Sequence, residues 1–310
     1  MAVDQFAPAP RPPLDIAVLT QFLNSLHSYS QDLVQHLSSG QKLCHYTTLE
    51  GALGIISSGD LWLTDSRYSN DDEELKYGHQ LVDDVLDELE NDAKTDVQRL
   101  EWLRRLRARI KEGRQEHVYI CCFCEKENLL SQWRGYAENG GGLSIEFDPN
   151  GFMAVAGPDC PHGLMRLWKV FYDRSQQEKI VRDAIEYPYW PAGDDDRIRF
   201  IVDALQFFMP TFKNGDFREE QERRLIFTPN PAALPKPKFR TRHGLLVPYF
   251  SLRELSQSPG IGFGLALSIK NVLIGPGPHR ALNVESSKLM LDQHGHTSVT
   301  VQASPTPFRG

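Results

Sequence analysis

Short β-prone segments recur along the whole of this chain, but the helical segments between them are unevenly spaced. The strand-like segments include LCHYT, LWLT, EHVYICCFCE, LSIEFD, LWKVFYD, LLVPYFSL and LSIKNVLIGPG. A parallel sheet built from βαβ units would need one helix after each strand, and that regular alternation is missing. We therefore predict an α+β fold with a mixed, mostly antiparallel sheet as its core and peripheral helices.

The longer helical patterns that the argument needs here lie in four regions. From Asp15 to Gly40 the apolar residues repeat with the i, i+3, i+4, i+7 spacing of one helix face. Charged helical sequence runs from Asp71 to Gly113, and two further helices are expected at Arg174–Tyr187 and Asp196–Phe212. These helices surround the predicted sheet.

Composition limits the class of protein. The chain has 310 residues, 40% of them hydrophobic, which is enough for a sizeable core. A formal net charge of -7 argues against a highly basic nucleic-acid coat, although a local basic groove stays compatible with it. No run of apolar residues is long enough for a membrane span, and no secretory core begins the chain.

We expect a disordered tail over residues 1–14 and a single α+β domain over residues 15–310, because no Pro-, Gly- or Ser-rich linker divides the latter. Five cysteines without a framework spacing indicate a reducing, cytoplasmic location: Cys44, Cys121, Cys122, Cys124 and Cys160. Within EHVYICCFCE they are expected to act as small apolar residues of a buried strand, and no metal site is predicted.

The stretch KLCHYTTLEGALGIISSGDLWLT predicts a strand, a helix and a second strand in close succession. Thr47 and Glu50 form a capping-box pattern at the start of the helix, and Gly59 is placed to end it. His45 lies inside the first strand. It is either a satisfied core histidine or a residue that holds a ligand.

The stretch FREEQERRLIF carries two carboxylates close together. If it is extended, Glu220, Glu222 and Arg224 lie on one face, and Arg224 can neutralise one of the acids. Such a pair suits a catalytic site. The alternative is an exposed edge strand or a helix start with solvated charges.

The stretch SQWRGYAENGGG offers aromatic and cationic groups within a few positions. Trp133 and Tyr136 could supply a stacking surface and Arg134 a phosphate contact. The alternative is a helix that packs its aromatic side chains into the core.

Five blocks together resemble domain-of-unknown-function family 2971. They are HYTTLEGALGIISSGDLWLTDSRYSNDDEELKYG, CCFCEKENLLSQWRGYAENGGGLSIEFD, FREEQERRLIF, GLLVPYFSL and IKNVLIGPG, in that order. The resemblance extends over about residues 43–277. In that family the glutamate block tends to read Glu-x-Glu-Trp-Arg, whereas this chain has Arg223 at the tryptophan position.

More distantly, the arrangement resembles the ADP-ribosyltransferase superfamily, in which an early strand carries His-x-Thr or His-x-Ser and a late strand carries a glutamate. The resemblance places His45 and Thr47 on the first motif and Glu220 and Glu222 on the last. It implies a fold of that type, and NAD as the substrate. Tyr77 would stack on nicotinamide, with Tyr68 and Tyr136 as rivals for that role.

The resemblance also implies a role for each residue. Glu222 would bind the ribose and stabilise the oxocarbenium-like transition state, while Glu220 would orient or deprotonate the acceptor. His45 would hydrogen-bond the adenosine ribose, and the Tyr46 backbone would hold the carboxamide. Arg134 would meet the pyrophosphate. The acceptor is expected to be a protein or nucleic acid.

Two other functions stay open at this point. One is a nucleic-acid-binding or nucleic-acid-processing defence or toxin protein without NAD chemistry, which would use the basic runs Arg104–Arg109 and Lys236–Arg242. The other is a non-catalytic sensor that binds a nucleotide.

Overall fold

The computed structural model describes residues 21–22, 41–68, 73–113, 117–153, 163–191, 193–229, 236–242, 244–257 and 267–307. The predicted tail over residues 1–14 and most of the predicted helix from Asp15 to Gly40 lie outside these residues. Phe22, one of the apolar residues of that helix, is described and is buried among aromatic side chains, including Tyr187 and Trp190.

One sheet organises the described part of the chain. Its strands are β1 (Leu43–Thr47), β2 (Trp62–Asp65), β3 (Tyr119–Cys124), β4 (Leu143–Phe147), β5 (Gly163–Lys169), β6 (Glu222–Pro229), β7 (Lys238–Arg242), β8 (Leu245–Ser251), β9 (Ile269–Ile274) and β10 (Thr300–Ala303). The order is β10-β9-β4-β1-β3-β2-β8-β7, with β6 paired to β3 and β5 paired to β6. Among these pairs β9–β10 is parallel and the others are antiparallel, so the predicted mixed, mostly antiparallel sheet is confirmed.

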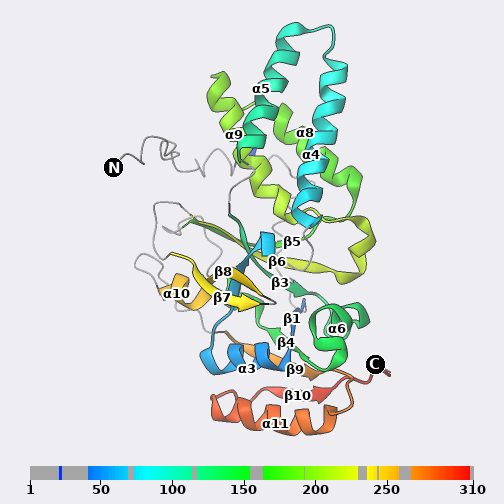
Figure 1. Ribbon diagram of the computed structural model, residues 1–310, viewed down its shortest axis with the longest axis vertical. Coiled ribbons are helices and arrows are strands. Elements are labelled where there is room, and N and C mark those ends of the chain that lie inside the picture. Colours follow the sequence, from blue (N-terminus) through cyan, green and yellow to red (C-terminus); the bar gives the residue numbers. More distant parts are fainter. Residues whose placement is uncertain are drawn as a thin grey trace.

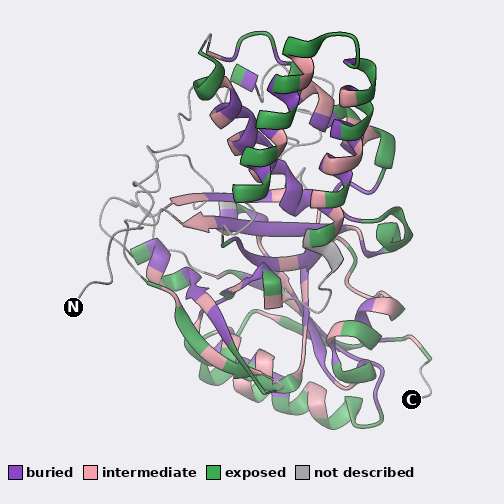
Figure 2. Ribbon diagram, turned by 45° about the horizontal axis from the view of Figure 1, so that its top comes forward, coloured by how far each residue is buried: buried purple, intermediate pink, exposed green. Residues whose placement is uncertain are grey.

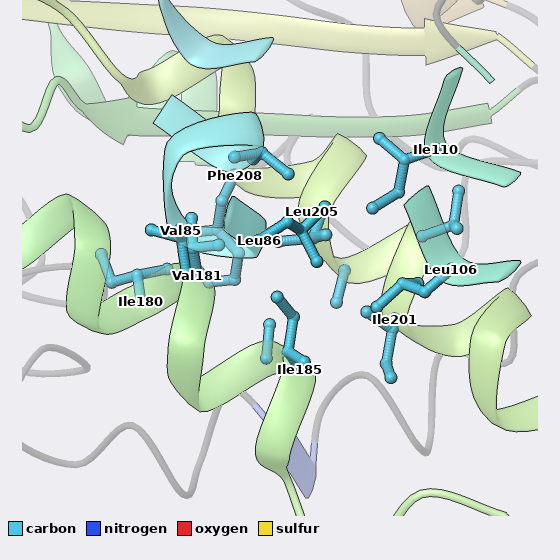
Figure 3. Close-up of a cluster of buried hydrophobic side chains, with 14 of the residues drawn as sticks. Val85, Leu86, Leu106, Ile110, Ile180, Val181, Ile185, Ile201, Leu205 and Phe208 are labelled. Atoms are coloured by element: carbon cyan, nitrogen blue, oxygen red, sulfur yellow. The ribbon is translucent and has the colours of Figure 1, made fainter. Parts of the chain in front are cut away.

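A four-helix layer covers one side of the sheet (Figure 1). It contains α4 (Glu73–Asp92), α5 (Val97–Gly113), α8 (Arg174–Glu186) and α9 (Asp194–Phe208). The apolar faces of these helices meet in one buried cluster, which includes Leu86, Leu106 and Ile201 (Figure 3). None of the described helices is long and apolar enough to cross a membrane.

Shorter helices lie around the remainder of the sheet: α3 (Leu49–Ser58), α6 (Leu130–Tyr136), α7 (Pro149–Met153), α10 (Leu252–Gln257) and α11 (Arg280–Gln293). A second apolar cluster joins the sheet to some of them and includes Leu63, Phe147 and Leu255. Figure 2 shows the resulting pattern, with buried residues along the strands and exposed residues on the outer faces of the helices. The prediction of a single domain stays a prediction.

Local signals predicted α3 well, with one correction. The N-cap is Thr48, whose Oγ1 accepts a hydrogen bond from the Gly51 backbone N–H at 3.0 Å, so the expected capping box at Thr47 is off by one residue. Thr47 is still part of β1. Gly59 ends the helix with φ 60, as predicted, because this left-handed conformation favours glycine.

Candidate functional site

A small pocket lies where β1 and β3 separate. The two strands share one residue pair, Cys44 with Cys124, whereas β3 pairs with β6 along its length and with β2 near its start. The pocket is lined by residues of β1, β3, α6 and the start of β6: Cys44, His45, Tyr46, Cys122, Phe123, Cys124, Gln132, Tyr136, Glu220 and Glu222. The pocket is therefore lined by residues from both the first and the second half of the chain.

His45 lies on β1, and its side chain reaches the neighbouring strand β3. Its Nδ1 donates a hydrogen bond to the backbone carbonyl of Cys122 at 2.9 Å. Burial is the main cause that lowers the pKa of His45; the hydrogen bond to Cys122 partly offsets it, and the charge of Arg240 lowers the pKa further. The imidazole is therefore neutral near pH 7 with its proton on Nδ1, which leaves Nε2 as a hydrogen-bond acceptor.

Glu222 is a buried, ionised carboxylate at the start of β6. Arg224 donates from Nε to Oε1 at 2.7 Å and from Nη2 to Oε2 at 2.9 Å, and Lys213 Nζ donates to Oε2 at 3.1 Å. Burial alone would raise the pKa of Glu222, but Arg224 and then Lys213 lower it to about 2. The predicted pairing of Arg224 with one of the acids is confirmed.

Glu220 also lines the pocket, but it lies before β6 and is not a residue of that strand. It ends the short 3-10 helix η4 (Gly215–Glu220), and Gln221 turns with φ 44 before β6 begins. The expectation of one extended segment through both acids is therefore wrong. The edge-strand alternative is also wrong, because β6 is buried and lies between β3 and β5.

Lys213 is the residue that joins the two acids, and sequence reasoning missed it. Its Nζ lies 2.6 Å from Glu220 Oε2 and 3.1 Å from Glu222 Oε2, with the lysine side chain 3% exposed. The available signal was a single lysine at the end of the apolar run FFMPTFK. A charge in such a run needs a buried partner.

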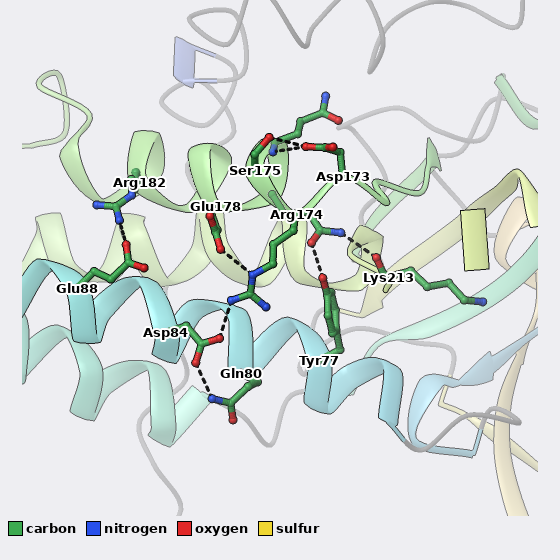
Figure 4. A network of polar contacts seen from close by, with 12 residues as sticks. Tyr77, Gln80, Asp84, Glu88, Asp173, Arg174, Ser175, Glu178, Arg182 and Lys213 are labelled. Atoms are coloured by element: carbon green, nitrogen blue, oxygen red, sulfur yellow. Dashed lines mark hydrogen bonds and ion pairs between the residues drawn. The ribbon is translucent and has the colours of Figure 1, made fainter. Parts of the chain in front are cut away.

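A hydrogen-bonded chain ties Lys213 to the helical layer (Figure 4). The Tyr77 hydroxyl donates to Gln177 Oε1 at 2.8 Å, and Gln177 Nε2 donates to the backbone carbonyls of Phe171 and Lys213 at 2.5 and 2.9 Å. Tyr77 thus supports the segment that carries Lys213. It does not line the pocket, where it was expected to stack on nicotinamide.

The other predicted residues divide into two groups. Tyr46 and Tyr136 line the pocket, whereas Thr47 and Arg134 do not; Arg134 is exposed on α6. The Tyr46 hydroxyl is fixed, because it donates to the Lys126 carbonyl and accepts from the Leu129 N–H, both at 2.9 Å. Burial, followed by the charge of Glu220, raises the pKa of Tyr136, which keeps its hydroxyl protonated.

The pocket is small. Water-sized molecules can occupy about 50 Å³ of it, which corresponds to a few waters or one small polar group. A dinucleotide that entered it would have most of its atoms outside the pocket. Within the described parts of the chain, no group of three or more His, Cys, Asp or Glu side chains could hold a metal ion.

These features define an α+β protein with a mostly antiparallel sheet and a small pocket lined by His45 and by two glutamates that Lys213 joins. A family model described as a protein of unknown function (DUF2971) matches residues 132–225. The match confirms the predicted resemblance to that family. It runs from Gln132 in α6 to Leu225 in β6. No curated protein and no solved structure was found to match the chain.

Proposed function

We propose that this pocket is the reaction centre of an NAD-dependent ADP-ribosyltransferase-like enzyme, which cleaves the nicotinamide–ribose bond and modifies a macromolecular acceptor. One observation carries the proposal. His45, Glu220 and Glu222 line the same pocket although they come from distant parts of the chain.

Glu222 suits the bond-breaking step. As the bond between ribose C1′ and the nicotinamide nitrogen breaks, its electron pair leaves with nicotinamide and positive charge develops on the ribose. A carboxylate with a pKa of about 2 is ionised at any physiological pH and can stabilise that charge. Arg224 and Lys213 hold it in a fixed orientation, so that little reorganisation is needed during the reaction.

Glu220 suits the second half of the reaction. It would accept the proton of the acceptor group as the lone pair of that group forms the new bond to C1′. His45 Nε2 would accept a hydrogen bond from a ribose hydroxyl. Tyr136 would supply the ring beside nicotinamide, and the Tyr46 backbone would hold the carboxamide. Nicotinamide and one proton are released for each transfer.

Release of nicotinamide from labelled NAD, in the presence of cell lysate as a source of acceptor, tests the proposal. We expect E222Q and E220Q to lower the rate by at least about 100-fold, and R134Q to leave it unchanged. E222Q removes the negative charge that compensates Arg224 and is expected to lower stability. E220Q is therefore tested as a second variant. Circular dichroism would check the fold of each. The proposal fails if the wild type releases no nicotinamide, or if folded E222Q and E220Q match it.

The nucleic-acid alternative draws no support from the basic run of α5. Arg105 pairs with Asp194 and Asp195, and Arg107 pairs with three acids of α4. Arg109 pairs with Glu112. These contacts are typical of a solvated helix face with compensated charges.

A further inference from the structure

The sheet face that carries the carboxylates also carries a cationic and aromatic strip at its far end. Opposed residues of neighbouring antiparallel strands share a face, and so do alternate residues of one strand. When the paired residues are followed from β6 to β7, those on this face are Glu222, Cys124, Ile120, Thr64, Tyr249, Lys238 and Arg240. A ligand that extends out of the pocket along this face would therefore approach Arg240.

Arg240 is held in place by stacking. Its guanidinium carbon lies over the Trp62 ring, 5.2 Å from the ring centroid, and its Nη2 donates to Thr64 Oγ1 at 2.9 Å. The Trp62 ring packs in turn on Tyr249, with 4.5 Å between the centroids. Stacking of this kind fixes the plane of a guanidinium and lowers the entropy cost of binding an anion.

Arg240 has no compensating acid within the described ranges of the chain. No carboxylate among the described residues pairs with it, whereas Lys238 on the same strand pairs with Glu254. Its Nε is buried and has no hydrogen-bond partner in the part of the chain that the structure describes. Burial and then the nearby charge of Arg242 lower the pKa of Arg240, so a bound anion would relieve an unfavourable environment.

The contacts of Arg240 reach toward the pocket: Arg240 bonds Thr64, which pairs with Ile120 of β3, two residues before Cys122 of the pocket lining. The pocket itself has room for one small group, so the phosphates of a nucleotide would lie outside it. Arg134, the cation that the sequence suggested for this purpose, does not line the pocket. A phosphate group that lay outside the pocket along this face would meet Arg240.

We propose that Arg240 is the phosphate-binding residue of this site and that its ligand is a nucleoside diphosphate. The inference rests on the proposed function in one respect: if the protein uses NAD, the ADP half of NAD is the ligand of Arg240. A guanidinium binds a phosphate through two parallel N–H···O bonds, which gives orientation as well as affinity.

Calorimetric titration with ADP tests the inference without any turnover. We expect ADP to bind the wild type, R240Q to weaken it by at least 10-fold, and R134Q, which removes an exposed cation of α6, to have no effect. R240K keeps the charge without the planar fork, so an intermediate affinity is expected. Adenosine, which has no phosphate, should not distinguish R240Q from the wild type. Thermal unfolding would show that each variant is folded.

Failure of this inference can be told apart from failure of the proposed function. Equal affinity of ADP for R240Q and the wild type, or no binding to either, would overturn the inference even if NAD is cleaved. Arg240-dependent binding of ADP without nicotinamide release would sustain it and reject the transferase. If single-stranded oligonucleotides depend on Arg240 and ADP does not, the ligand class is wrong.

Discussion

At the scale of single residues, two cations determine how Glu222 behaves. Arg224 and Lys213 neutralise a carboxylate that burial alone would protonate more easily. The same arrangement links stability to pH, because the folded protein binds the Glu222 proton more weakly than the unfolded chain does. Replacing either cation would leave a buried, uncompensated negative charge, which is among the most costly defects in a protein interior.

We predict that acid weakens the wild type through Glu222. The pKa of this group falls from 4.5 to about 2 on folding, so its contribution is complete above pH 4.5 and is lost as the pH falls toward 2. The loss is roughly 3 kcal/mol of unfolding free energy. Urea titrations between pH 6 and 2.5 measure it. E222Q is less stable at neutral pH and should lack this part of the pH dependence; parallel curves for the two proteins would contradict the assignment.

At the scale of elements, the loop before β4 lies so close to β1 that one position has room only for glycine. A Cβ at Gly142 would lie 2.2 Å from the backbone oxygen of Thr47, the residue that ends β1. Gly275 donates its N–H to the Gly142 carbonyl, so the ends of β1, β4 and β9 are packed together there. This contact sets the position of the strand that carries His45.

We predict opposite effects for two glycine-to-alanine changes. G142A should lower the free energy of unfolding by about 1–3 kcal/mol, because the clash is with backbone that cannot move aside. G54A, in the interior of α3 with open space around it, should raise it by about 0.5–1 kcal/mol through helix propensity. Urea unfolding of both variants checks the pair. A G142A protein as stable as the wild type would show that the loop can shift.

At the scale of the whole molecule, the helical layer and the sheet have separate apolar clusters, and polar contacts help to join them. Gln177 of α8 is completely buried and bonds the Lys213 segment, whose side chain reaches the pocket. Arg224 of β6 adds a link from the sheet through the Pro210 carbonyl. The position of the four helices therefore bears on the position of the two acids.

We predict that Q177L costs about 2–4 kcal/mol, because the backbone carbonyls of Phe171 and Lys213 both lose the hydrogen bond from Gln177, and the Phe171 carbonyl keeps only that from the Lys213 N–H. Q176L at the neighbouring, half-buried position is the matched control and should change stability by less than about 0.5 kcal/mol. Hydrogen exchange should also show faster exchange around Lys213 in Q177L. Equal stability of the two variants would mean that water replaces the lost bonds.

The sequence by itself determined the α+β class, the strands around the cysteines and after Gln221, the helix between Thr48 and Gly59, and the pairing of Arg224 with an acid. These features follow from periodicity, caps and short spacings, which are local. Only the tertiary structure decided that Lys213 joins Glu220 to Glu222, that Tyr77 and Arg134 stay out of the pocket, and that Arg240 stacks on Trp62 and bonds Thr64. Strand order and buried ion pairs bring together residues from distant parts of the chain, and sequence spacing does not specify those distances.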